Sequence, residues 1–413
     1  MNAWSSLLPE RMALTGLILI LIWTLGAAWV FEIWAMVAAE AAIFALTALA
    51  GCVWLYGGMW PASKWLSAPL AAAGIWGLVQ VGAGATVEGF VTGLAVIRIA
   101  SILGALMLGL FAFADHRNAR LFRAALILLG TLLAAVAIAQ LLTADGKIYW
   151  IVRSHDTDHL PMGPFLSENS YAEFIELLLP VALWRAGQPP RGWIFALCAA
   201  VMYASVIASL SRAGSVLVSL EVLAVLVFAL LVRRASIRRD TMRRVLVAAA
   251  IIVAVASAFG WQQVLKRFDS RDLWQVRREY FRSSVTMLRS RPLMGFGLGT
   301  WPIVYPRFAV IDLTATSPHA HNDWMEWASD GGVPFVLLML IPVVRAAKQA
   351  LRRPWGIGII AVSLHALVDF PFQVYSILFL FFLMLAALEV TPPLLLFGKR
   401  HPAADLSAVR QAS

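Results

Sequence analysis

The chain has 413 residues, of which 61% are hydrophobic and only 14% are charged. A water-soluble domain of this length cannot bury so large an apolar share in one core, so the composition excludes a soluble globular protein and predicts an integral membrane protein. The formal net charge of +10 is explained by basic loops that face anionic headgroups, which leaves little reason to expect a nucleic-acid partner.

Apolar stretches recur along nearly the whole chain, and each is long enough to cross a bilayer as a helix of about 17 to 25 residues. They predict an all-α polytopic membrane protein with about twelve transmembrane helices. The predicted order is transmembrane helices 1–5 over residues 1–142, an outer loop over 143–168, helices 6–9 over 169–260, a large outer loop over 261–331, helices 10–12 over 332–391, and a cytoplasmic tail over 392–413.

The basic residues of the short loops set the predicted orientation. Alternate connections carry clusters of arginine and lysine, among them "RRASIRRDTMRR" (233–244), whereas the short loops on the other side carry Glu32, Glu88 or almost no charge. Basic loops are retained on the cytoplasmic side, so both termini are predicted to be cytoplasmic.

The large outer loop stands out by its length and its charge. Connections this long are uncommon unless they have a function, and this one is rich in arginine on the side that the charge rule disfavours. Two interpretations stay open: a solvated basic surface near anionic lipid, or a site for an anionic partner.

Within that loop, "DLWQVRREYFRSSVTMLRSRP" (272–292) has apolar residues close to a 3.6-residue period with arginines between them. This pattern predicts a basic amphipathic helix that lies in a membrane interface and ends before Pro292. The following "PLMGFGLGTW" (292–301) is rich in glycine and predicts a tight turn in which backbone approaches backbone.

The last part of the loop, "SPHAHNDWMEW" (317–327), gathers unusually many polar side chains. Ser317 followed by Pro318 predicts a helix start, and Gly331 with Gly332 predicts a break before the next transmembrane helix. On that helix one face would carry the polar residues His319, Asp323, Glu326 and Asp330, with His321 on the apolar side.

This separation gives the two histidines different predicted roles. His319 would meet carboxylates as an ion-pair partner, whereas desolvation would keep the imidazole of His321 neutral and able to take a proton. Two alternatives remain: His321 as a buried histidine with one structural hydrogen bond, or a zinc site of His319, His321 and a nearby carboxylate, which the projection disfavours because it splits the ligands.

At this point the residues resemble a known family. "HAHNDWMEWASDGG" (319–332) is similar to the signature of the O-antigen ligase and polysaccharide polymerase superfamily, in which a His-Asn pair is followed by glycine; His321, Asn322 and Gly332 match it.

Further stretches resemble the same superfamily in the right order. They are "GPFLSENSYAEFIELLLP" with Asn169 at the polar position, "SLSRAG" with Arg212, the arginine-led amphipathic helix with Arg277, and "HALVDFPFQ" from His365 to Gln373. The resemblance covers roughly residues 163–373.

The resemblance implies glycosyl transfer on the periplasmic face of a bacterial inner membrane. The donor would be a glycan on undecaprenyl diphosphate, and the acceptor a sugar hydroxyl on lipid A-core for a ligase, or on a second lipid-linked repeat for a polymerase. His321 would be the general base of an inverting reaction. Arg212 and Arg277, supported by Arg278, would bind the diphosphate in place of a metal ion, so neither metal nor cofactor is expected. Asn322 would orient the histidine or hold a sugar hydroxyl.

Other polar residues receive supporting roles. Arg98 lies within a predicted transmembrane helix, where an ion pair with Glu40 or Glu221 is expected rather than direct contact with the diphosphate. His365 and Asp369 would share one helical face, either in a structural hydrogen bond or at the acceptor site.

A function of a different class stays open, namely a transporter of lipid-linked glycans. It would predict inverted repeats and ionisable groups near the bilayer centre, whereas the polar residues of this chain cluster at one membrane face.

Overall fold

The computed structural model of the chain describes residues 8–30, 33–57, 63–153, 161–188, 190–233, 272–311 and 318–391, and the findings below concern these residues. The predicted transmembrane helix around Ile251, the predicted helix cap Ser317 and the predicted tail at 392–413 lie outside them.

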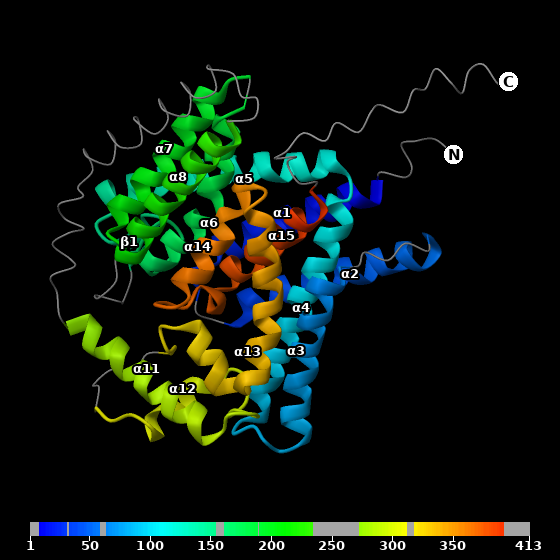
Figure 1. Cartoon of the computed structure of the whole chain (residues 1–413), viewed down its shortest axis with the longest axis vertical. Coiled ribbons are helices and arrows are strands. Elements are labelled where there is room, and N and C mark those ends of the chain that lie inside the picture. Colours follow the sequence, from blue (N-terminus) through cyan, green and yellow to red (C-terminus); the bar gives the residue numbers. More distant parts are fainter. Residues whose placement is uncertain are drawn as a thin grey trace.

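The elements follow one another as helices joined by turns (Figure 1). The first five are α1 (Leu8–Gly26), α2 (Ile33–Gly57), α3 (Lys64–Gly82), α4 (Gly89–Phe113) and α5 (His116–Thr143). A two-stranded antiparallel pair, β1 (Lys147–Ile148) and β2 (Val152–Arg153), is followed by α6 (Glu168–Ala186), α7 (Gly192–Ser209) and α8 (Arg212–Arg233). The large loop contains α11 (Asp272–Ser290), α12 (Trp301–Val304) and η1 (Tyr305–Arg307). The last elements are α13 (Asp323–Ala350), η2 (Pro354–Gly356), α14 (Ile357–His365), η3 (Pro371–Gln373) and α15 (Tyr375–Val390).

Eight helices of the described residues are long and apolar enough to cross a membrane, namely α1 to α5, α7, α8 and α13. Three further helices, α6, α14 and α15, occupy predicted transmembrane positions. The protein is therefore an all-α polytopic membrane protein, as the composition predicts. α14 and α15 are short, with 9 and 16 residues, because a polar turn that contains Asp369 interrupts the apolar sequence between them.

Two helices form the interior of the bundle. α6 packs against α5, α7, α8 and α14, and α15 packs against α4, α1 and α13. Nearly every side chain of these two helices is buried. Figure 1 shows α6, α7, α8 and α14 on one side of the molecule, α3 and α4 on the other, and α13 between the two groups.

The predicted amphipathic helix is present as α11, which ends at Ser290, two residues before Pro292. Its apolar face buries Tyr280 and Met287 in a small cluster with Trp301 and Tyr305. The helix also packs against α13. The large loop is therefore a folded layer over one end of α13, where it holds the candidate site (Figure 1).

Candidate active site

The glycine-rich turn at 292–300 lies directly against a kink in α13. Gly332 leaves helical geometry with a φ of +71°, and a Cβ added there would lie 2.0 Å from the carbonyl oxygen of Leu293. A Cβ added at Gly295 would lie 2.3 Å from the carbonyl oxygen of Asp330. Both glycines therefore allow an approach that any side chain would block. The predicted turn and the predicted break at Gly331-Gly332 are both confirmed.

The side chain of Gln80 in α3 holds this turn against α13 through hydrogen bonds to its backbone. Its Nε2 donates to the carbonyl oxygens of Met294 at 2.5 Å and Asp330 at 2.8 Å, and its Oε1 accepts from the backbone N of Leu298 at 3.2 Å. The sequence interpretation assigned a role to Arg98 among the first five transmembrane helices but missed Gln80. The available signal was a lone amide in an apolar helix, because a buried amide needs partners.

α13 begins later than predicted. Asn322, not Ser317, caps it: its Oδ1 accepts from the backbone N of Met325 at 3.0 Å, and residues 318–322 precede the helix. His321 stands immediately before this cap with a φ of +49°. The predicted projection of His321 onto an apolar helical face is therefore wrong, since Asn322 competes as an equally good N-cap.

The turn after α14 meets the start of α13. The amide of Asn322 donates to the carbonyl oxygen of Leu367 at 2.8 Å. The carboxylate of Asp323 accepts from the backbone N of Phe372 at 2.8 Å and from Nε2 of Gln373 at 2.9 Å. These bonds fix the position of His321 relative to Asp369, which lies in the same turn.

Asp369 is the centre of the site. His321 Nδ1 lies 3.2 Å from its Oδ1, and a terminal nitrogen of Arg277 lies 3.2 Å from its Oδ2. Asn169 of α6 donates its side-chain amide to the same Oδ2 at 2.5 Å. The side chain of Asp369 is 5% exposed, whereas those of His321 and Arg277 are 17% and 24% exposed. The carboxylate is thus buried behind two side chains that reach solvent.

The partners of Asp369 determine its charge. Burial alone would raise the pKa of Asp369, but the hydrogen bond and charge of His321, with the charges of Arg277 and His365, lower it below the usual aspartate value. An ionised carboxylate only accepts, so in the neutral imidazole of His321 the hydrogen lies on Nδ1 and Nε2 is the acceptor nitrogen. Tyr280 stacks on the imidazole with ring centres 6.0 Å apart, and Phe370 contacts it edge-on at 4.9 Å.

The other predicted arginines occupy different positions. Arg212 is the first residue of α8, and its neighbour Ser211 donates to Asn169 at 2.7 Å. Through Asn169 the start of α8 therefore adjoins Asp369. Arg278 is exposed on α11, one position along from Arg277 and away from Asp369.

His319 forms the predicted ion-pair contact, although it does so from the turn before the helix. Its Nδ1 lies 3.0 Å from Oε1 of Glu326, whose other oxygen accepts from the backbone N of Ala320 at 2.8 Å. His319 and His321 therefore contact different carboxylates, and the alternative zinc site is not assembled by their arrangement.

His365 and Asp369 do not share a helical face, because α14 ends at His365. Instead His365 Nδ1 lies 2.8 Å from Oε1 of Glu176, and its Nε2 lies 3.8 Å from Oε1 of Glu173. Glu173, His365 and Asp369 offer metal-ligand atoms within 4.8 Å of one another. Both oxygens of Asp369 already accept from donors, one of them Arg277, so the chemistry of this group fits an ion-pair network better than a metal centre.

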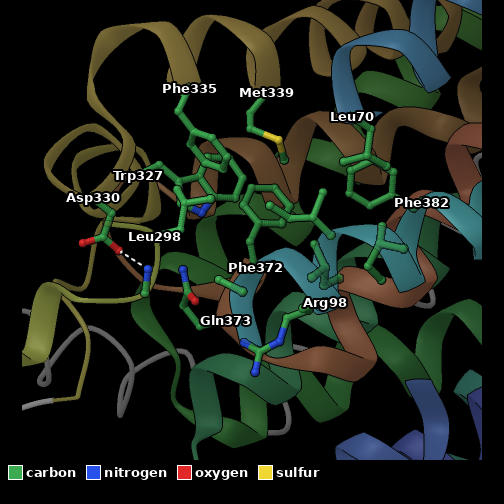
Figure 2. Close-up of a pocket in the computed structure, with 15 residues that line it drawn as sticks. Leu70, Arg98, Leu298, Trp327, Asp330, Phe335, Met339, Phe372, Gln373 and Phe382 are labelled. Carbon is green, nitrogen blue, oxygen red and sulfur yellow. Dashed lines mark hydrogen bonds between the residues drawn. The ribbon is translucent and has the colours of Figure 1, made fainter. Parts of the chain in front are cut away.

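Arg98 pairs with Glu40 at 3.9 Å, the first of the two predicted partners. It also borders a mostly apolar cavity between α3, α4, α13 and α15, whose other polar lining residues are Asp330 and Gln373. Figure 2 shows these side chains around the cavity, with the carboxylate of Asp330 bonded to the backbone of Gly299. His321, Asp369 and Arg277 do not line it.

Comparison with known proteins agrees with this geometry. A family model described as O-Antigen ligase matches residues 193–341, a segment that contains Arg212, Arg277 and His321. No curated protein matches the chain. The match includes the His-Asn pair and the arginine helix that the sequence comparison singled out, and it supports a function of the ligase or polymerase type. Residues 193–341 of this membrane protein, less than half of the chain, are thus similar to the O-antigen ligase family.

Proposed function

We propose that the protein is an O-antigen ligase that moves a glycan from undecaprenyl diphosphate to a sugar hydroxyl on lipid A-core. One observation carries this proposal: within a chain that matches the family model in part, a buried aspartate contacts both a histidine and an arginine, so that a base and an anion-binding group meet at one carboxylate.

In the proposed reaction His321 is the general base. Asp369 accepts the hydrogen of Nδ1 and leaves Nε2 as the acceptor that removes the proton of the sugar hydroxyl. The ionised Asp369 also stabilises the imidazolium that forms, as a buried carboxylate does in other Asp-His pairs. General base catalysis of this kind contributes about 10²- to 10⁴-fold to a rate.

The arginines act on the leaving group. As the acceptor oxygen bonds to the anomeric carbon, the bond from that carbon to the diphosphate oxygen breaks and its electron pair leaves on the diphosphate. Arg277 has five N–H donors and Asp369 engages only one of its nitrogens, so others remain for phosphate oxygens. Arg212 would contribute a second guanidinium from the start of α8, and together they would stabilise the growing negative charge.

Attack from the face opposite the diphosphate inverts the anomeric centre. In the proposed orientation the site lies on the periplasmic face of the inner membrane, with both termini in the cytoplasm. This orientation rests on the distribution of basic loops and on the need for the large loop to meet a lipid-linked glycan.

The test is transfer by purified protein in detergent. Wild type and His321→Ala receive undecaprenyl-diphosphate glycan with or without lipid A-core, and products are separated on a gel. We expect a glycan-extended lipid A-core that requires both substrates and disappears in the variant. The matched control is His116→Ala, at the first residue of α5, which should keep wild-type activity. Longer lipid-linked glycans formed without lipid A-core would instead identify a polymerase, and no transfer at all would refute the proposal.

A further inference from the structure

A buried histidine between two glutamates lies directly behind the Asp369 centre. The side chains of Glu173, Glu176 and His365 are at most 1% exposed. The two glutamates stand one turn apart on α6, and His365 is the last residue of α14. Each ring nitrogen faces a carboxylate oxygen, at 2.8 Å for Glu176 and 3.8 Å for Glu173.

This geometry constrains where protons lie. A carboxylate only accepts, so the 2.8 Å contact with Glu176 places a hydrogen on Nδ1 of His365. Nε2 lies 3.8 Å from the Glu173 oxygen, beyond hydrogen-bond distance but close enough for charge attraction, and an imidazole with a hydrogen on both nitrogens is positively charged. Among the described residues, Glu173 Oε1, Glu176 Oε2 and His365 Nε2 have no hydrogen-bond partner. These buried atoms therefore depend on charge compensation within the group.

The surrounding charges favour the same assignment. The titratable groups that influence these three residues are Asp369, Arg277 of α11, Asp323 of α13 and Glu221 of α8. Carboxylates outnumber cations in this set, and burial makes uncompensated negative charge costly. A positively charged His365 between Glu173 and Glu176 reduces this excess of negative charge.

We propose that His365 is held as an imidazolium between Glu173 and Glu176, and that this buried positive charge sets the pH range in which the Asp369–His321 pair works. His365, Glu173 and Glu176 are positioning residues, because they act through Asp369 and do not touch the reacting atoms. The link to catalysis rests on the function proposed above. The positive charge of His365 does not depend on that function, because it is inferred from the contacts of His365 with the two glutamates.

The proposal predicts shifts of opposite sign for two isosteric changes. His365→Gln removes the positive charge and leaves two glutamates near Asp369, so His321 would hold its proton to higher pH. Glu176→Gln removes the negative charge that accepts the hydrogen bond of His365, so His321 would lose its proton at lower pH. The loss of one charge from this buried group should move the midpoint of His321 protonation by on the order of one pH unit. A purely structural role would lower activity in both variants without moving the pH dependence in opposite directions.

The experiment measures the protonation of His321 directly. Purified protein is treated with diethyl pyrocarbonate, which modifies neutral imidazole, from pH 5 to pH 9, and tandem mass spectrometry quantifies modification at His321. The pH of half-maximal reaction should rise in His365→Gln and fall in Glu176→Gln. The exposed Glu88→Gln should leave it unchanged. If His365→Gln does not fold, Glu176→Gln carries the test, because its midpoint should still fall.

Transfer assays on the same variants separate the two proposals. Opposite modification shifts without any glycan transfer by wild type would support the buried charge and refute the proposed function. Transfer by wild type with unshifted midpoints, or with both midpoints moved in the same direction, would overturn the buried charge and leave the function standing.

Discussion

His321 Nδ1 lies 3.2 Å from Oδ1 of Asp369, although 48 residues separate them in the chain. The contact forms because Asn322 and Asp323 bind the backbone of the turn that carries Asp369. The ring orientation of His321, the proposed base, is therefore set by the turn between α14 and α15, and not by residues near it in the chain.

Asp369→Asn tests this contact. An amide can donate to Nδ1, which favours the tautomer with its hydrogen on Nε2, so the proposed base would lose its acceptor nitrogen. We expect the turnover number to fall about 10²- to 10⁴-fold with little change in folding yield. The measure is the initial transfer rate at saturating substrates, with Asp145→Asn, an exposed aspartate of the first outer loop, as the control. A variant that keeps more than half of the wild-type rate would contradict the proposed role.

The pH dependence of wild type follows from the charge of Asp369. Its pKa is lowered in the folded protein. The stabilisation that its charge provides is therefore fully present above the unfolded value of about 3.9 and is lost only as the pH falls through the lower folded value. Between pH 5 and 8 thermal stability should show no loss from this group. Melting temperatures of wild type measured across that range check this expectation, and a fall between pH 8 and pH 5 that is absent in Asp369→Asn would contradict it.

Gln80→Leu tests the bond between α3 and the glycine-rich turn. Leucine has a similar size but removes three hydrogen bonds: the Met294 carbonyl oxygen and the Leu298 N–H lose their partner, whereas the Asp330 carbonyl oxygen keeps its bond from the backbone N of Gly297. At about 1 kcal/mol for each lost hydrogen bond, we expect a loss of about 2 to 4 kcal/mol of unfolding free energy. Thermal unfolding in detergent, followed by tryptophan fluorescence, measures it. Gln275→Leu on the exposed face of α11 is the control and should unfold with wild type.

Gly332→Ala tests the kink in α13. The added Cβ would lie 2.0 Å from the carbonyl oxygen of Leu293, and the φ of +71° disfavours any side chain. We expect a destabilisation of more than about 2 kcal/mol, or a displaced turn with loss of transfer. The matched change is Gly51→Ala inside α2, where nothing lies within 4 Å and where alanine should be neutral or stabilising. Equal melting temperatures for the two variants would show that the turn does not need glycine.

Ser290→Cys tests the orientation. Ser290 is exposed at the end of α11, so a cysteine there should react with a membrane-impermeant maleimide added to the periplasm of intact cells. Cys52 and Cys198 are replaced by serine to remove background, and this cysteine-free protein is the control. Labelling that requires rupture of the inner membrane would reverse the proposed topology.

Apolar periodicity and length were sufficient to predict the class of fold, because each transmembrane helix must be continuous and apolar by itself. The amphipathic helix and the glycine turn were predicted for the same local reason. The start of α13 was not, since Ser317 and Asn322 are both good caps and only the contact of Asn322 with Leu367 decides between them.

Contacts between distant segments were the part that the sequence could not supply. Asn169, Arg277 and His321 were singled out one by one, and Asp369 was assigned to a helical face with His365. All three residues contact Asp369, and the position of Asp369 depends on where α14 ends. Gln80 was missed because its partners are backbone atoms more than 200 residues away, which no side-chain motif records.

The short length of α15 has a consequence for how a lipid reaches the site. Its last turn carries Glu389, which pairs with Arg345 at 3.0 Å, and we take this ion pair to lie at one surface of the bilayer. Sixteen residues extend about 24 Å at 1.5 Å per residue, less than the roughly 30 Å of a hydrocarbon layer. With that placement the turn with Asp369 would end below the opposite headgroups. In the proposed reaction the polyprenyl chain would then stay among the acyl chains while its diphosphate reaches the arginines, and the cost of about 0.8 kcal/mol for each CH₂ drawn into water would not arise.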